Sequence, residues 1–323
     1  MRAVRIHHLS GPSALVVDEV SEPTLRAGEV LIHVKACGVN FPDVLLTRGL
    51  YQFKPTPPFS PGGEAAGVVA AVGGGVTHVA PGDRVAVTVL HGAFVEQLVV
   101  PAPAVVKLPD AVSFEVGAAT LLTYATTYHA LVDRAALQAG EKLLVLGAAG
   151  GVGIAACELG AMLGARVIAA ASSAEKIAFC REHGAADGID YSHEDLKERV
   201  KQLTGGGADV IYDPVGGALA EPALRAIAWQ GRYLVVGFAS GEIPKIPLNL
   251  TLPKGCQIVG VFWGLFAMRE PAKNHAHAAQ ILAWVADGKL RPAIDDVLPF
   301  SAAGEALLRL ESRQVKGKLV LVP

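Results

Sequence analysis

The pattern of apolar and polar positions changes near residue 118. Before that point, short apolar runs alternate with turn sequences; such runs cover 29–38, 65–73 and 84–89, and turns fall at 26–29 and 81–84. Apolar runs of this length bounded by Gly and Pro are typical of strands joined by tight turns. The first 110 residues therefore predict a mainly antiparallel, barrel-like β domain.

The second half of the chain alternates between two kinds of segment. An Ala-rich stretch to about residue 137 predicts a helix, and further helical patterns end near residues 163, 183, 203 and 229. The predicted strands between them are 142–147, 166–171, 188–190, 208–213, 231–237 and 257–263. Alternating strands and helices predict a doubly wound parallel sheet, and strands that are apolar throughout suit a sheet covered on both faces.

The last 60 residues predict a return to the first domain, because six strands already complete a wound sheet by residue 263. Helices are expected at about 273–287 and 302–312, followed by a strand at 318–322. A length of 323 residues also suits two domains. We predict one domain from 1–120 and 265–323, and a nucleotide-binding domain over 121–264.

Composition removes several classes of function. Hydrophobic residues make up 51% of the chain, and its net charge of -2 lacks the basic excess of a nucleic-acid binder. No uncharged stretch resembles a membrane span, and residues 1–11 contain no apolar core of a signal peptide. We therefore expect a cytoplasmic protein without nucleic-acid or membrane partners. Its cysteines are expected to be reduced, at Cys37, Cys157, Cys180 and Cys256.

A glycine-rich turn follows the strand at 142–147. Its members are Gly147, Gly150, Gly151, Val152 and Gly153, and a helical pattern begins directly after the turn. A strand–turn–helix unit of this kind lets backbone N–H groups and the positive helix end approach a pyrophosphate. A tight turn that binds nothing is the structural alternative, but the βαβ setting favours a dinucleotide site.

The residues after the next strand indicate which dinucleotide binds. A site for NAD usually places an acid at the tip of the second strand, about 20 residues beyond the glycines. Here the strand at 166–171 is followed by Ser172, Ser173 and, three residues later, Lys176. Hydroxyls and a lysine suit a 2′-phosphate, so we predict NADPH as the cofactor. The alternative is that Lys176 is an ordinary surface lysine.

Several segments together resemble a known family. The residues that carry the resemblance are CGVNFPDVLLTRGLY (37–51), PGGEAAGVV (61–69), PGDRVA (81–86), GAAGGVG (147–153), DYSHEDLKERV (190–200), YDPVGG (212–217), VGVFWG (259–264) and ESRQVKGKLVL (311–321). Across its length the chain resembles the zinc-free quinone oxidoreductases of the medium-chain dehydrogenase/reductase superfamily. The resemblance implies a GroES-like catalytic domain built from both chain ends, with a Rossmann domain between them. It also implies a homodimer joined through the edges of the Rossmann sheets.

The same resemblance implies roles for individual residues. Lys176, Tyr191 and Arg313 match the residues that hold the 2′-phosphate in zinc-free quinone reductases. The matches to the nicotinamide half of the site are Thr126, Gly216, Gly237, Phe238, Phe262 and Trp263. For Phe262 and Trp263 the alternative is ordinary packing at a sheet edge.

Zinc ligands are missing at the matching positions. Zinc-dependent relatives place a Cys where this chain has Asn40 and a His where it has Gly63. A glycine has no donor atom, and an amide is a poor zinc ligand. The four-cysteine lobe of those relatives is also missing. We therefore predict an enzyme without a metal.

The predicted chemistry is hydride transfer from NADPH to a quinone. Alternatives are reduction of α,β-unsaturated carbonyl compounds or enoyl thioesters, a non-catalytic crystallin-like NADPH-binding protein, and an unusual metal alcohol dehydrogenase. Asn40 and Tyr51 are the candidates for donating a hydrogen bond to a substrate oxygen, because both match pocket positions of the family. The alternative is that both residues are structural, Asn40 as a turn residue and Tyr51 as a half-buried residue in the wall of the pocket. Tyr128 and His129 could relay protons, but no spacing assigns them that role.

Overall fold

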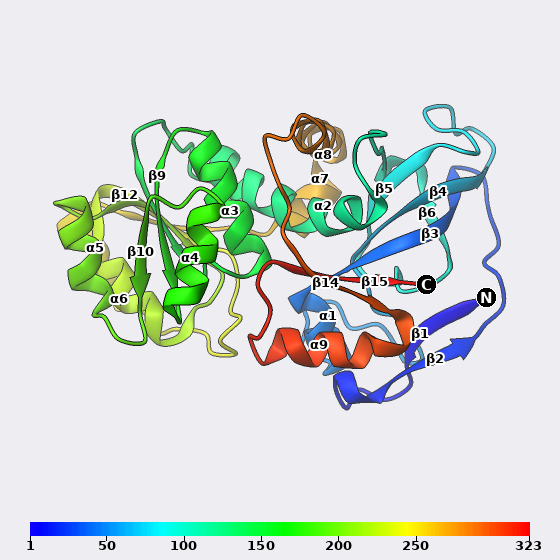
Figure 1. The fold of residues 1–323 in the computed structure, drawn as a ribbon, viewed down its shortest axis with the longest axis horizontal. Coiled ribbons are helices and arrows are strands. Elements are labelled where there is room, and N and C mark those ends of the chain that lie inside the picture. Colours follow the sequence, from blue (N-terminus) through cyan, green and yellow to red (C-terminus); the bar gives the residue numbers. More distant parts are fainter. The chain divides into compact units, whose positions relative to one another are not determined.

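The computed structural model describes residues 1–323, which form two compact units (Figure 1). Unit 1 contains Met1–Leu122 and Ala267–Pro323, and unit 2 contains Thr123–Phe266. None of the helices combines the length and the apolar composition needed to cross a membrane.

Unit 1 is built around one large sheet. The strands of unit 1 are β1 (Arg2–Ile6), β2 (Leu15–Glu19), β3 (Glu29–Val39), β4 (Glu64–Val72), β5 (Arg84–Thr88), β6 (Gln97–Pro101), β7 (Val105–Lys107), β14 (Ile294–Pro299) and β15 (Lys318–Val322). Its helices are α1 (Phe41–Thr47), α8 (Pro271–Ala286) and α9 (Ala303–Glu311), with 3-10 turns at Pro12–Ala14, Ala102–Ala104 and Phe300–Ala302. Helix α2 (Phe114–Tyr128) begins in unit 1 and ends in unit 2.

The sheet of unit 1 is mainly antiparallel, as predicted, but it is not a closed barrel. Seven strands pair in the order β14–β15–β3–β4–β5–β7, with β6 also paired to β3, while β1 and β2 form a separate hairpin. Strand β7 has only three residues and pairs only with β5, and β14 pairs only with β15. No ladder of hydrogen bonds joins these two ends of the sheet, which corrects the expectation of a barrel.

Unit 2 is a doubly wound parallel sheet. Its strands are β8 (Lys142–Leu146), β9 (Arg166–Ala171), β10 (Asp187–Asp190), β11 (Ala208–Asp213), β12 (Ile227–Val235) and β13 (Gln257–Gly260). Its helices are α3 (Gly151–Met162), α4 (Ala174–Glu182), α5 (Leu196–Thr204), α6 (Ala220–Arg225) and the start of α7 (Trp263–Arg269), with a π-helical segment at His129–Arg134 and 3-10 turns at Gly217–Leu219 and Leu248–Lys254.

The strand order in unit 2 confirms the predicted Rossmann arrangement. It runs β10–β9–β8–β11–β12–β13, with every pair parallel. Helices α3 and α4 cover one face of the sheet and α5 and α6 the other (Figure 1). Strands β8, β9 and β11 are fully buried at their centres, as at Leu144, Ile168 and Ile211, which explains why they lack an alternating pattern.

Three predicted boundaries were wrong. The helix expected to reach about residue 229 ends at Arg225, and Trp229 lies on β12, because Ile227 already pairs with Ala208 of β11. The strand expected to reach residue 263 ends at Gly260, where its pairing with β12 stops. The Ala-rich helix changes to π-helical bonding at residue 129. Tertiary pairing set these boundaries, and local composition did not reveal it.

Candidate functional site

The glycine-rich turn lies between β8 and the N-terminus of α3. A Cβ atom on Gly153 would lie 2.5 Å from the carbonyl oxygen of Gly147, so only glycine allows the turn to close this tightly. At Gly150, a Cβ atom would meet no protein atom nearer than 3.5 Å. Protein packing therefore does not require glycine at 150.

Gly150 also occupies the N-cap position of α3, and no side chain caps this helix. The N–H groups of Gly151 and Val152 belong to its first turn, where backbone donors and the helix dipole favour a negative charge. The open space and the uncapped helix end fit the pyrophosphate of a dinucleotide.

The residues predicted to select the 2′-phosphate gather at the ends of β9 and β10. The Nζ atom of Lys176 donates to the Ser172 hydroxyl at 3.3 Å, and the Ser173 hydroxyl accepts from the Lys176 backbone N–H at 3.3 Å. Tyr191 directly follows β10, and its N–H donates to the Ala171 carbonyl. The tip of β9 carries Ser172 and Ser173 in place of an acid, and these hydroxyls with the Lys176 ammonium fit a phosphate. The carboxylates of this edge belong to Glu175, which is exposed in the first turn of α4, and to Asp190, which ends β10 opposite Ala171.

An aspartate that the sequence did not single out organises two other loops. Asp213, at the end of β11, accepts hydrogen bonds from the backbone N–H groups of Val215 at 2.7 Å and Gly216 at 2.8 Å. Its backbone carbonyl accepts from Gly237, and the Tyr233 hydroxyl donates to its second carboxylate oxygen. Burial and the negative charge of Asp213 raise the pKa of Tyr233. Asp213 therefore holds the turns that carry Gly216 and Gly237.

The remaining predicted nicotinamide residues lie on separate elements of unit 2. Thr126 is half-buried on α2, and Phe238 lies against Gly216. Phe262 is 42% exposed just before α7, and Trp263 begins that helix half-buried. The exposure of Phe262 argues against ordinary core packing for that ring.

Unit 1 contains a buried polar cluster of four side chains: Asn40, Asp43, Glu64 and Lys318. The Lys318 ammonium donates to the Val39 carbonyl at 2.8 Å, to Glu64 at 2.7 Å and to the side-chain oxygen of Asn40. Glu64 also accepts from the backbone N–H of Leu122. The cluster joins β3, β4 and β15, so its members are up to 278 residues apart in the chain.

The cluster fixes the side chain of Asn40. Its amide nitrogen donates to Glu64 at 2.8 Å and to the Gly38 carbonyl at 3.3 Å, while its oxygen accepts from Lys318. Both amide hydrogens are thus engaged inside the protein, and the residue is only 5% exposed. The arrangement differs from the free donor that the sequence suggested, and Asn40 holds its neighbours in place.

Asp43 accepts from the backbone N–H of Asn40 at 2.8 Å and from that of Gly62 at 3.0 Å. Burial nevertheless raises the pKa of Asp43 to about 7, the two hydrogen bonds and the charge of Lys318 opposing the shift and Glu64 adding to it. This carboxyl group is therefore close to its titration midpoint at neutral pH.

Tyr51 and Arg313 are the other predicted site residues in unit 1. Tyr51 is half-buried, and burial together with the charge of Asp43 raises the pKa of its phenol. The hydroxyl therefore stays protonated at neutral pH and can donate a hydrogen bond. Arg313 is exposed after the end of α9.

The residues at the expected metal position do not fit a zinc ion. Gly63 has no donor atom, the Asn40 amide is already engaged, and the Lys318 ammonium is bound to Glu64. Cys37 is fully buried, its thiol donates to the Ala93 carbonyl, and burial raises its pKa. No group of three or more His, Cys, Asp or Glu side chains in the structure is arranged to hold a metal.

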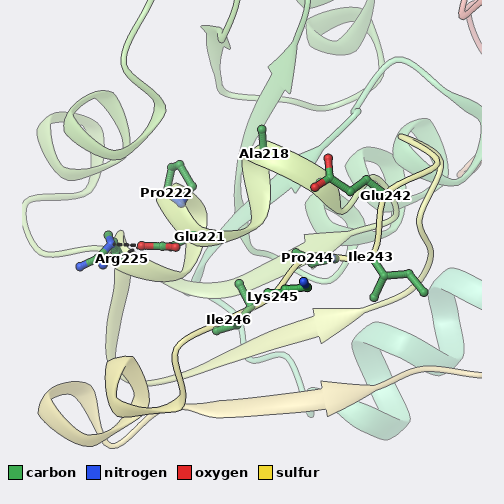
Figure 2. Close-up of a pocket in the computed structure, with 10 residues that line it drawn as sticks. Ala218, Glu221, Pro222, Arg225, Glu242, Ile243, Pro244, Lys245 and Ile246 are labelled. Atoms are coloured by element: carbon green, nitrogen blue, oxygen red, sulfur yellow. Dashed lines mark hydrogen bonds and ion pairs between the residues drawn. The ribbon is translucent and has the colours of Figure 1, made fainter.

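A surface cavity of about 550 Å³ lies elsewhere in unit 2. Arg225 and Glu221 pair on one side of it, and the segment with Glu242 and Ile243 forms the other side (Figure 2). Gly217 contributes to the lining, but none of the predicted cofactor residues does. The cavity therefore adds no residue to the nucleotide site.

Comparison with known proteins agrees with this geometry. Residues 26–110 match the alcohol dehydrogenase GroES-like domain, and residues 151–279 match the family described as zinc-binding dehydrogenase. The chain is 40% identical to a quinone oxidoreductase-like protein 2 homolog of Nematostella vectensis, over 99% of this chain and 88% of that protein. It is 36% identical to a quinone oxidoreductase of Pseudomonas aeruginosa, over 97% of both chains.

Among solved structures, Escherichia coli quinone oxidoreductase complexed with NADPH superimposes with a TM-score of 0.94, at 30% identity and full coverage of both chains. The fold and these relatives define the chain as a member of the medium-chain dehydrogenase/reductase superfamily. Within that superfamily it belongs to the quinone oxidoreductase branch. The named relatives are oxidoreductases, and the Escherichia coli structure is a complex with NADPH.

Proposed function

We propose that the protein is an NADPH-dependent reductase of quinones that works without zinc. The observation that carries the cofactor preference is the tip of β9, where Ser172 and Ser173 stand in place of an acid and the Lys176 ammonium bonds to Ser172. An acid there would repel a 2′-phosphate, and an ammonium group attracts it. Arg313 and Tyr191 are proposed to complete the phosphate site.

The proposed cofactor site divides into two parts. The pyrophosphate lies at the start of α3, held by backbone N–H groups of Gly151, Val152 and Gly153. The nicotinamide half is lined by Thr126, Gly216, Gly237, Phe238, Phe262 and Trp263. When bound, NADPH supplies a hydride. The protein positions the cofactor and the substrate relative to each other and stabilises the charge that develops on the substrate.

In unit 1, Tyr51 is the proposed donor to the substrate oxygen, because its phenol stays protonated. Asn40 is proposed to act indirectly, by keeping the cluster with Glu64 and Lys318 in place. A fixed hydrogen-bond donor matters most when negative charge grows on a carbonyl oxygen. Tyr51 therefore also favours a second candidate function, the reduction of α,β-unsaturated carbonyl compounds.

The two functions separate in one experiment. Chelator-treated enzyme is given NADPH with a simple benzoquinone or with a short enal, and NADPH consumption is followed. Faster turnover of the quinone supports the first candidate, and turnover of the enal alone supports the second. Tight NADPH binding without turnover of either acceptor would overturn both and leave a non-catalytic binding protein.

We also propose a homodimer joined at β13. This strand pairs with β12 on one side only, so its other edge has unpaired backbone groups. Exposed apolar side chains on and around this edge belong to Trp229, Leu248, Leu252 and Ile258. Sedimentation of the wild type should give the mass of two chains, and Ile258→Lys should give one. A monomeric wild type would overturn this proposal.

A further inference from the structure

A histidine–aspartate pair lies in the π-helical segment at the end of α2. The Nδ1 atom of His129 is 2.8 Å from the carboxylate of Asp133, four residues further on. The backbone N–H of Ala135 donates to the Ala130 carbonyl five residues back, which is π-helical bonding. Such segments interrupt α-helices and are frequent at functional sites.

The pair has the geometry of an acid–base group. A carboxylate that accepts from Nδ1–H fixes the tautomer and directs Nε2 away from the helix. The Nε2 atom of His129 has no hydrogen-bond partner and is not among the buried unpaired polar atoms. The ring is stacked on Phe266, with 4.1 Å between centroids and 16° between planes, so its orientation is fixed.

Three connections place His129 beside the proposed nicotinamide half of unit 2. Thr126 lies three residues earlier on the same helix, so both side chains share a face. The stacked Phe266 lies one turn after Phe262, to whose carbonyl its N–H donates. Arg134 donates to the Gly260 carbonyl at the end of β13. The π-helical segment that carries His129 is therefore tied to α7 through Phe266 and to the end of β13 through Arg134.

We propose that His129, oriented by Asp133, is the proton donor of the reaction. This inference rests on the proposed function. Hydride addition to a quinone or an enone leaves an anion on the substrate. The Nε2–H bond of the His129 imidazolium breaks, its proton binds to that anion, and neutral imidazole with Nδ1–H on Asp133 remains. Solvent then returns the proton to Nε2.

His129→Gln is the decisive variant, because glutamine can still bond Asp133 but cannot act as a general acid. We expect kcat with the enal to fall about 100-fold, the usual contribution of a general acid. The decline of kcat with rising pH should disappear, and KM for NADPH should stay unchanged. Asp133 is the charged partner of the ring, and Phe266 of α7 stacks on it. The effect with benzoquinone should be smaller, because water can protonate hydroquinone oxygens.

His183→Gln is the matched control in the same unit. His183 also bonds a carboxylate through Nδ1, at 2.5 Å from Glu158, but it lies at the end of α4. Its replacement should leave kcat and the pH profile unchanged. Tyr51→Phe should lower kcat while keeping the pH dependence of the wild type.

NMR of histidine-labelled protein tests the position of His129 without measuring turnover. The His129 ring resonance, assigned by its loss in His129→Gln, should shift when NADP⁺ is added, and that of His183 should not. An active wild type whose His129→Gln variant keeps kcat within twofold, or a His129 signal that ignores NADP⁺, would overturn the inference alone. A wild type without turnover of either acceptor would overturn the proposed function with it.

Discussion

The cofactor edge of unit 2 consists of the glycine turn at 147–153 and of Ser172, Ser173 and Lys176. It and the polar cluster of unit 1 are built in opposite ways. The first uses backbone N–H groups, glycines and two hydroxyls, all within about 50 residues of chain. The second uses buried ionised side chains from strands at the two ends of the chain. Replacing a residue should therefore have different consequences in the two places.

At the cofactor edge, most residues are proposed to contact the cofactor and few are needed for packing. Their replacement should therefore mainly weaken cofactor binding. In the polar cluster, each charge depends on its partner because burial removes water from both. Loss of one partner should therefore affect stability before it affects chemistry.

Lys318→Met should destabilise the protein by about 3–5 kcal/mol, because it leaves the Glu64 carboxylate buried without its cation. Urea unfolding measures the loss. Adding Glu64→Gln should recover a large part of it. Arg225→Met, which breaks an exposed ion pair with Glu221, should cost less than about 1 kcal/mol. Equal losses at the two sites would contradict the account.

Asp43→Asn should change how stability depends on pH. The folded protein keeps the Asp43 proton up to about pH 7, whereas the unfolded chain releases it near pH 4. The folded state thus binds more protons in this window, and the free energy of unfolding falls as pH rises through it. The wild-type decline from this group is on the order of 4 kcal/mol. Unfolding measured from pH 4 to 8 should be flatter in the variant; an unchanged slope would refute the raised pKa.

Two alanine substitutions in the glycine turn should separate packing from binding. Gly153→Ala places a Cβ atom 2.5 Å from the Gly147 carbonyl oxygen, so the backbone must shift, at about 1–3 kcal/mol of stability. Gly150→Ala meets only an ordinary 3.5 Å contact and should keep the wild-type melting temperature while weakening NADPH binding. If Gly150→Ala binds NADPH normally, the pyrophosphate assignment fails.

Lys176→Ala should weaken NADPH binding by about 1–3 kcal/mol, the range for a charge-assisted hydrogen bond, with NADH binding nearly unchanged. Fluorescence titration with both cofactors measures the difference. Glu175→Ala, one residue away on the exposed side of α4, is the control and should weaken neither. A similar loss of affinity for NADPH and NADH in Lys176→Ala would remove its assigned role.

Local signals in the sequence predicted the parallel sheet and the cofactor edge. The glycines, Ser172 and Lys176 lie within one strand–helix–strand unit, where sequence spacing fixes spatial order. The cluster around Lys318 could not be found in this way, because its partners are more than 250 residues away. The predicted role of Asn40 as a donor likewise overlooked Lys318 and Glu64, which engage its amide.

Asp213 and the His129–Asp133 pair could not be predicted from the sequence for a second reason, which is that packing and not spacing defines their roles. Asp213 lies inside a motif that the sequence did single out, but its burial and its bonds to the loops follow from packing against Tyr233. The His–Asp spacing of four residues is common on helices. Its burial, the stacked Phe266 and the π-helical bonding distinguish this pair from a surface ion pair, and none of them is visible in the spacing.

The central claim is that this protein reduces its substrate with NADPH and without zinc. The most direct test measures kcat/KM for NADPH and for NADH with the better acceptor, on chelator-treated enzyme whose zinc content is determined in the same sample. The account predicts a clear preference for NADPH, with full activity at a negligible zinc content. Activity that requires one zinc per chain, or that prefers NADH, would contradict it.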